Sequence, residues 1–340
     1  MSHPAVDRPR FQLLDGPSPL APLPRLSAAL GGRAEVWIKR EDLLPLAFGG
    51  NKLRNLEFLV GAAIAEGADS LVTAGRRWSN HGRLTAAAGA VAGLDVHLVL
   101  SGPPADPPNP GVRLDVLLGA VVHQARTADR AERDALVAQV IADLRAAGRH
   151  PYLIPVGGGG SIGAHGQLLA AEELLGQAAA RGIGVDAIVL PSATGVTQVG
   201  LLAGLRAGGS PASVVGVAVA HPPDELRPTI ADLLAELGTM TGIPVDPAQI
   251  ELDGAELGPG YGRPTGAADE ATRLLARTEG ILVDPIYTAK ALAGLVRRVR
   301  EGRADGRTVV FWHAGGLPGL FEPPESPSPD GPPPGGPSPG

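Results

Sequence analysis

The chain has 340 residues, a formal net charge of −6 and no cysteine, and 44% of its residues are hydrophobic. Its length is enough for about two domains. The lack of cysteine excludes thiolate nucleophiles, disulfides and cysteine zinc sites, and the eight histidines show no metal-ligand spacing, so no metal is expected. Because there is no basic run and no alternation of basic and aromatic residues, no nucleic acid partner is expected.

Sequence features also predict the cellular location of the protein and the order of its C-terminal segment. The N-terminus lacks a charged head followed by an apolar run, so we expect no secretory signal. No stretch reaches the roughly 18 apolar residues that span a bilayer, so we expect no membrane partner. These features and the lack of cysteine favour a cytoplasmic protein. Residues 323–340 are rich in proline, glycine and serine, which predicts a disordered tail.

Strand-like and helix-like segments alternate along the chain. This alternation predicts parallel sheets covered by helices, an α/β fold, and the length suggests two such domains facing one cleft. In sheets of this kind ligands bind at the carboxyl ends of the strands. The predicted strands are 35–39, 70–74, 96–100, 187–190, 214–220 and 307–312, and the predicted helices are 53–67, 82–92 and 195–207.

Lys52 stands directly after Gly49-Gly50-Asn51, at the start of a predicted helix. Glycines let the backbone approach a ligand closely. A lysine in a desolvated pocket has a lowered pKa, and its free amine can form a Schiff base with a carbonyl. The alternative is a glycine turn before a surface helix that happens to begin with lysine.

The stretch 192–198 also follows a predicted strand and opens a helix. Its backbone N–H groups and the hydroxyls of Thr194 and Thr197 suit a bound anion. It lacks the Gly-x-x-x-x-Gly-Lys-Ser/Thr pattern of nucleotide sites, so a single phosphate fits better than three. An ordinary helix cap is the alternative.

Four further stretches place polar side chains where they could bind a ligand. Residues 75–82 follow a strand and open a helix, where serine and asparagine can hold a carboxylate or merely cap the helix. The glycine run at 157–163 fits a hinge or close packing better than a phosphate cradle. Residues 284–290 place a Tyr-Thr pair at a helix head. Residues 313–316 end an apolar strand with two glycines. Each stretch alone is a weak signal.

Taken in order, these stretches resemble the D-cysteine desulfhydrase and 1-aminocyclopropane-1-carboxylate deaminase family, from about Lys39 to Leu320. The resemblance implies a tryptophan-synthase-β-like fold of type II, with pyridoxal 5′-phosphate in a cleft between two α/β domains, and a homodimer. The matching text is Lys39-Arg40-Glu41-Asp42, Phe48-Gly49-Gly50-Asn51-Lys52, Ser79-Asn80-His81, Pro155-Val156-Gly157-Gly158, Thr194-Gly195-Val196-Thr197-Gln198, Tyr261-Gly262-Arg263-Pro264, Asp284-Pro285-Ile286-Tyr287-Thr288 and His313-Ala314-Gly315-Gly316. On this pattern, residues 1–50 and 161–322 are expected to form the larger, cofactor-binding domain and residues 51–160 the smaller one.

The resemblance also implies roles for individual residues. Lys52 is expected to be the Schiff-base lysine, Ser79 to hold the substrate carboxylate or relay a proton, and Asn80 to hydrogen-bond the phenolic oxygen of the cofactor. The expected catalytic residues are Lys52, Ser79, Tyr261 and Tyr287. The expected cofactor-binding residues are Asn51, Lys52, Asn80, Thr194, Gly195, Val196, Thr197, Tyr287 and Thr288. The expected substrate-binding residues are Trp78, Ser79, Asn80, His81 and Tyr261.

Thr288 and two differences from the family pattern affect which substrate is expected. In the resemblance, the deaminase branch has a glutamate at the position of Thr288, against the pyridine nitrogen, whereas the desulfhydrase branch has a threonine. The family usually has a glutamine before its Ser-Asn pair, where this chain has Arg76-Arg77-Trp78, which changes the shape and charge of the pocket. The family also has a second lysine three residues after the catalytic one, where this chain has Asn55, so one cation near the phosphate is lost unless an arginine replaces it.

We therefore expect a pyridoxal-phosphate lyase that acts on a small amino acid, with conversion of D-cysteine to pyruvate, hydrogen sulfide and ammonia as the leading candidate. One alternative keeps the cofactor and changes the chemistry, as in a 1-aminocyclopropane-1-carboxylate deaminase or a biosynthetic lyase or β-replacement enzyme with a larger or more acidic substrate. A second alternative is a non-catalytic relative that only binds a ligand, although the intact Lys52 argues against it.

Overall fold

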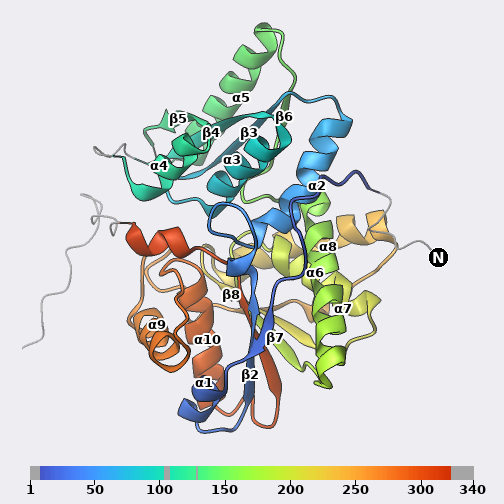
Figure 1. Cartoon of the computed structure of the whole chain (residues 1–340), viewed down its shortest axis with the longest axis vertical. Helices are drawn as coiled ribbons and strands as arrows, with labels where there is room; N and C mark the ends of the chain where they lie inside the picture. The colour runs from blue at the N-terminus through green and yellow to red at the C-terminus, as the bar shows by residue number, and fades with distance from the viewer. Residues whose placement is uncertain (1–7, 103–107, 128, 323–340) are drawn as a thin grey trace, which may run out of the picture.

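The computed structural model describes residues 8–102, 108–127 and 129–322. These residues form two sheets, with the smaller sheet above the larger one in Figure 1. The predicted tail at 323–340 lies outside the described residues. No helix in the described part of the chain combines the length and apolar character needed to cross a bilayer.

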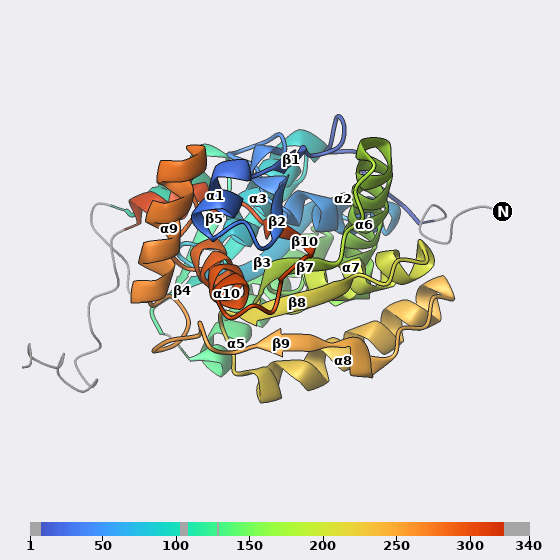
Figure 2. The same cartoon turned by 90° about the horizontal axis from the view of Figure 1, so that it is seen from below.

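The larger sheet has six strands in the order β1-β2-β10-β7-β8-β9, and all neighbours are parallel except β1 and β2. Helices α6, α7 and α8 cover one face, and α1, α9 and α10 cover the other, as Figure 2 shows. The strands are β1 (Leu20–Pro22), β2 (Glu35–Arg40), β7 (Ala187–Ser192), β8 (Ser213–Ala218), β9 (Glu251–Asp253) and β10 (Thr308–His313). The helices are α1 (Pro24–Ala29), α6 (Gly160–Arg181), α7 (Val196–Ala207), α8 (Pro223–Thr241), α9 (Gly266–Glu279) and α10 (Thr288–Arg300).

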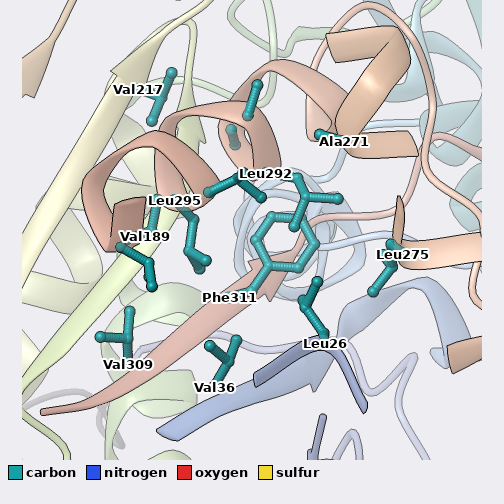
Figure 3. Packing of buried hydrophobic residues seen from close by; sticks show 14 of the residues in the cluster. Leu26, Val36, Val189, Val217, Ala271, Leu275, Leu292, Leu295, Val309 and Phe311 are labelled. Carbon is teal, nitrogen blue, oxygen red and sulfur yellow. The ribbon is translucent and has the colours of Figure 1, made fainter. Parts of the chain in front are cut away.

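Side chains of the central strands alternate between the two faces, as the pleat of a strand requires. In β10, Val310 and Trp312 pack toward α6 and α7, whereas Val309 and Phe311 pack toward α1, α9 and α10. Figure 3 shows the second face, where Phe311 lies between strand and helix residues. Burial on both faces explains why these strands read as continuous apolar runs.

The smaller sheet has four parallel strands in the order β5-β4-β3-β6. Helices α2 and α3 pack on one face and α5 on the other, while α4 packs beside α3. The strands are β3 (Ser70–Arg76), β4 (Asp95–Ser101), β5 (Val121–Ala125) and β6 (Pro151–Leu153). The helices are α2 (Lys52–Ala65), α3 (Asn80–Ala92), α4 (Pro110–Leu117) and α5 (Arg130–Ala146), and three short 3₁₀ turns, η1 (Glu41–Leu43), η2 (Pro247–Gln249) and η3 (Leu317–Phe321), complete the described chain.

The two parallel sheets with helices on both faces confirm the predicted α/β class. Each strand and helix predicted from the sequence is present, with ends that differ by two residues at most. The antiparallel pairing of β1 with β2 was not predicted. The domain boundaries at residues 50 and 160 stay a prediction.

A buried ionic network ties the first turn of α2 to η1 and α6. Arg54 donates from Nε to Glu41 at 2.6 Å and from Nη1 to Glu173 of α6 at 2.9 Å. Lys39 also donates to Glu173. Burial alone would lower the pKa of Arg54, but the carboxylates of Glu41 and Glu173 outweigh this and raise it. The network joins β2, η1, α2 and α6 close to Lys52.

We expect Glu41→Gln to lower the free energy of unfolding by about 3 kcal/mol, because it leaves a buried guanidinium short of one counter-charge. Glu41 is 0% exposed. The matched control is Glu270→Gln, which breaks a 2.7 Å pair with Arg300 in which Glu270 is 58% exposed, and it should change stability by less than about 1 kcal/mol. Denaturant unfolding of both variants measures the difference, and equal effects would contradict the role of the network.

Candidate active site

A cavity of about 440 Å³ lies between the two sheets. It is bordered by the carboxyl ends of β3, β4 and β7 and by the segments that follow β8 and β10, which is where parallel sheets bind ligands. The residues predicted for the site line this cavity, with Trp78 as the exception. Those that line it are Asn51, Lys52, Ser79, Asn80, His81, Thr194, Gly195, Val196, Thr197, Tyr261, Tyr287 and Thr288.

Lys52 is the first residue of α2 and lines the cavity. The turn before it is held close to the segment after β10, because Asn51 N donates to Ala314 O at 3.0 Å. A Cβ on Gly315 would lie 2.6 Å from Gly50 Cα, so this approach requires glycine. Burial lowers the pKa of Lys52 to about 8, which increases the share of free amine near neutral pH.

Lysine is rare in this chain, so few amines are candidates for a Schiff base with a carbonyl ligand. The sequence has three lysines, at positions 39, 52 and 290. Lys39 donates to Glu173, and Lys290 donates to the carbonyl oxygens of Leu257 and Gly260. Lys52 is the one lysine whose amine has neither a hydrogen bond nor an ion pair with a described residue and lines the cavity. A desolvated amine with no partner is suited to attack a carbonyl.

The head of α7 forms an anion cradle opposite Lys52. The first N–H groups of a helix have no partner within the helix, so those around Val196 and Thr197 are available to an anion. Asn51 Nδ2 donates to Thr197 Oγ1 at 2.9 Å and so ties the cradle to the lysine turn. Gly157 closes the other side, where a Cβ would lie 2.9 Å from Thr194 Cγ2. The cradle and the free amine fit a phosphorylated aldehyde such as pyridoxal phosphate.

Asn55 stands where the resemblance has a second lysine, and its amide braces the wall of the site. Its Nδ2 donates to Gly158 O at 2.9 Å, and its Oδ1 accepts from Gln167 Nε2 at 2.6 Å. Asn55 therefore holds the glycine loop in place and contributes no charge. Arg54 does not replace the missing cation, because its guanidinium is engaged by Glu41 and Glu173.

The head of α3 carries the Ser-Asn-His triplet. Ser79 is the N-cap of the helix and accepts from Gly82 N at 3.1 Å. Asn80 Oδ1 accepts from Arg83 Nη2 at 3.1 Å. His81 is buried, with its Nε2 3.0 Å from Thr73 Oγ1, and burial followed by the charge of Lys52 lowers its pKa to about 3, so it is neutral. Helix N–H groups beside a neutral histidine suit a substrate carboxylate.

Two tyrosines line the cavity, and a tryptophan lies close to one of them. The hydroxyls of Tyr261 and Tyr287 hydrogen-bond to each other, and burial raises the pKa of both, so they are protonated at neutral pH. Trp78 lies 6.2 Å from the ring of Tyr261, measured between centroids, and is not part of the cavity wall. The structure therefore gives Trp78 a place behind Tyr261, and its predicted contact with the substrate stays a prediction.

Comparison with known proteins agrees with this geometry. A family model described as "Pyridoxal-phosphate dependent enzyme" matches residues 11–315. The chain belongs to this family. The predicted cofactor, pyridoxal 5′-phosphate, is thereby confirmed.

Relatives with assigned names cover nearly the whole chain. It is 40% identical over 319 residues to a D-cysteine desulfhydrase of Salmonella choleraesuis (strain SC-B67), covering 92% of this chain and 95% of the relative. It is 38% identical over 328 residues to a D-cysteine desulfhydrase of Yersinia pseudotuberculosis (serotype O:1b, strain IP 31758), covering 94% and 98%. These matches confirm the family resemblance predicted from the motifs.

Solved structures confirm the type II fold. A crystal structure of an ACC deaminase homologue superposes with a TM-score of 0.87 at 34% identity, covering 94% of this chain and 95% of that chain. A crystal structure of a threonine deaminase superposes with a TM-score of 0.64 at 20% identity, covering 88% and 92%, which shows the shared fold alone.

Asp284 does not line the cavity but holds Thr288, which does, and the sequence analysis gave Asp284 no role. Its buried carboxylate accepts hydrogen bonds from the backbone N–H groups of Ile286, Tyr287 and Thr288, at 2.8–3.0 Å, and from Thr288 Oγ1 at 2.5 Å. Asp284 N in turn donates to Thr288 Oγ1 at 2.9 Å. The hydroxyl proton of Thr288 is therefore committed to Asp284, and a lone pair is left for the cavity. The spacing of an aspartate four residues before the threonine could have indicated this contact in the sequence.

Three cationic or titratable residues at the cavity mouth were also missed. Arg130 and Arg133 of α5 and His221, after β8, line the mouth, and Arg130 Nη2 lies 3.0 Å from His221 Nε2. The contact joins the smaller-sheet side to the larger-sheet side. An Asp129-x-x-Glu132 pattern, in which Asp129 caps the helix by accepting from Glu132 N at 3.0 Å, could have revealed where α5 begins. The described residues contain no group of three or more acidic or histidine side chains that could hold a metal ion.

Proposed function

We propose that this pyridoxal-phosphate enzyme is a lyase that removes the β-substituent and the amino group of a small β-substituted amino acid. The best candidate reaction is D-cysteine plus water to pyruvate, hydrogen sulfide and ammonia. The observation that carries the proposal is a neutral hydroxyl, Thr288, in the cavity of a chain about 40% identical to proteins named D-cysteine desulfhydrase.

The proposed roles of the polypeptide follow from the geometry of the cavity. Bound pyridoxal phosphate supplies an electron sink for the electrons released at the α-carbon of the substrate. The N–H groups at the head of α7 and the hydroxyl of Thr197 would hold the phosphate, and Lys52 would hold the aldehyde carbon. The amine of Lys52 would also take the α-proton of the substrate, and its lowered pKa favours the basic form.

The other predicted residues would orient the reactants. Ser79, Asn80 and the N–H groups of α3 would bind the substrate carboxylate, and Tyr287 and Tyr261 would border the ring and the substrate. Thr288 would accept a hydrogen bond from the ring nitrogen, because Asp284 takes its hydroxyl proton. A neutral acceptor stabilises positive charge on that nitrogen less than a carboxylate does.

This difference separates the proposed lyase from its alternatives. Opening a cyclopropane ring demands a stronger electron sink than expelling a good β-leaving group, so Thr288 favours β-elimination over the deaminase reaction. An intact Lys52 with a free amine disfavours a relative that only binds ligands.

The proposal is tested by pyruvate release from the purified holoenzyme. Cysteine and β-chloroalanine, each as the D- and L-isomer, are assayed beside 1-aminocyclopropane-1-carboxylate. We expect pyruvate from at least one β-substituted substrate, with D-cysteine preferred among these neutral ones. Release of 2-oxobutyrate from the cyclopropane substrate without pyruvate from the others would identify a deaminase, and no turnover at all would refute the lyase assignment.

We also propose a cytoplasmic homodimer. The exposed apolar side chains of Val116 and Leu117 on α4 and Phe321 on η3 provide a surface that a second copy could cover, and α4 contacts η3 directly. Sedimentation equilibrium of the full chain would distinguish a dimer from a monomer.

A further inference from the structure

Arg76 places a positive charge in the cavity wall that no acidic group balances. It is the last residue of β3, is half-buried, and lines the cavity. Within residues 8–102, 108–127 and 129–322, no hydrogen bond or ion pair engages its guanidinium. A half-buried guanidinium without an acidic partner in a binding site is suited to bind an anion through charge-assisted hydrogen bonds.

Among the described residues, the lysine and arginine side chains of the cavity wall are not balanced by any acidic side chain in that wall. The described residues that line the cavity include Lys52, Arg76, Arg130 and Arg133, and none of them is an aspartate or glutamate. Arg133 pairs with Asp134 at 2.7 Å, and Arg130 contacts His221. Arg76 is set apart from these, because its charge acts on the Tyr261–Tyr287 pair, where it opposes the rise in pKa that burial causes.

The guanidinium is held in place by an aromatic platform. Arg76 Cζ lies 5.8 Å from the ring centroid of Trp78, a cation–π contact, and Trp78 packs against Tyr261. Arg77 Cζ lies 5.1 Å from the same ring but does not line the cavity. The triplet that departs from the family therefore aims one arginine into the site and keeps the other outside it.

We propose that Arg76 binds a second acidic group on the substrate, so that the enzyme prefers β-substituted alanines whose substituent is a sulfonate or a phosphate ester. This rests on the proposed β-elimination. Both groups present tetrahedral oxyanions that a guanidinium fork can bind through two hydrogen bonds. Both also leave readily with their bonding electrons.

The reaction balances with water as the only co-reactant. Lys52 takes the α-proton, the Cβ–S or Cβ–O bond breaks, and its electron pair departs on sulfite or phosphate. Water then hydrolyses the remaining enamine, in its imine form, to pyruvate and ammonia. No oxidant or reductant is required.

The test compares kcat/KM of the holoenzyme for two acidic substrates, cysteate and O-phosphoserine, with two neutral ones, cysteine and β-chloroalanine, each as both isomers. Using both acids distinguishes a sulfonate site from a phosphate site. We expect wild type to favour at least one acidic substrate, and Arg76→Gln to lower the acidic-to-neutral ratio by roughly 10²-fold, since the anion loses its charged partner. Arg76→Lys should fall between. The control is Arg77→Gln, which should keep the wild-type ratio.

The outcomes separate this inference from the function on which it rests. Turnover of cysteine but of neither acid would overturn the role of Arg76 and leave the lyase assignment intact. An equal loss for acidic and neutral substrates in Arg76→Gln would place Arg76 at the common α-carboxylate and would also overturn it. No pyruvate from any substrate would refute both. If Arg76→Gln fails to fold, the wild-type ratio decides, together with its fall on addition of salt, which screens the acidic substrate more strongly.

Discussion

A Lys52→Ala variant is expected to fold normally and to lose both the yellow colour of the holoenzyme and its turnover. The physical reason is that the described residues of the cavity wall include one lysine, and burial has lowered its pKa to about 8. Alanine removes the covalent attachment and the base for the α-proton together, and the loss of a base alone costs about 10²–10⁴-fold in rate. Absorbance of the purified variant with added cofactor, together with pyruvate release, measures both effects.

The scarcity of lysine makes this prediction unusually direct to check. Borohydride reduction of the wild-type holoenzyme should fix the cofactor on a single peptide, and mass spectrometry can distinguish among Lys39, Lys52 and Lys290, the three lysines of the chain. Lys52→Arg is the matched control for charge, because a guanidinium keeps the cation but cannot form the bond. A label on Lys39 or Lys290, or an unchanged absorption band in Lys52→Ala, would contradict the assignment.

The central strands could be predicted from the sequence because burial on both faces makes them continuous apolar runs. Strand β3 was predicted to end at residue 74 but continues to Arg76, which is why the strand itself aims that arginine at the cavity. Helix α6 was missed, since it begins inside a run of four glycines that indicates a loop. It is helical because its apolar face packs against α7 and the larger sheet, a tertiary effect that local propensity does not contain.

The candidate site could be predicted to the extent that it consists of segments at strand ends. Lys52 and the cradle at Thr194–Thr197 meet because their segments lie at the carboxyl ends of the two sheets. Contacts between segments that are far apart in the sequence could not be predicted in this way. The position of Trp78 behind Tyr261 depends on the packing of a loop against the head of α3. The engagement of Arg54 by Glu173 links residues 119 apart in the chain.

Gly195→Ala is expected to weaken cofactor binding by about 100-fold. Gly195 is the N-cap of α7 and has φ 79°, a left-handed conformation that is strained for alanine. The added Cβ would also lie 2.3 Å from Cγ1 of the buried Ile230, so the head of α7 must move. Because catalytic and binding groups tolerate displacements of only about 0.5 Å, the cradle would lose its alignment with the phosphate. Titration of the apoprotein with pyridoxal phosphate measures the dissociation constant.

The same helix supplies the control, because Gly209 follows its other end with φ 67° and has nothing within 4 Å of an added Cβ. Gly209→Ala therefore carries the backbone strain of about 1–2 kcal/mol without the steric clash, and it should lower stability but leave cofactor affinity unchanged. Adding Ile230→Ala to Gly195→Ala should restore part of the affinity, because the clash is removed while the strain at Gly195 remains. If Gly195→Ala binds the cofactor as tightly as wild type, the head of α7 does not hold the phosphate, and the anion must be bound elsewhere in the cavity, where Arg76, Arg130 and Arg133 supply positive charge.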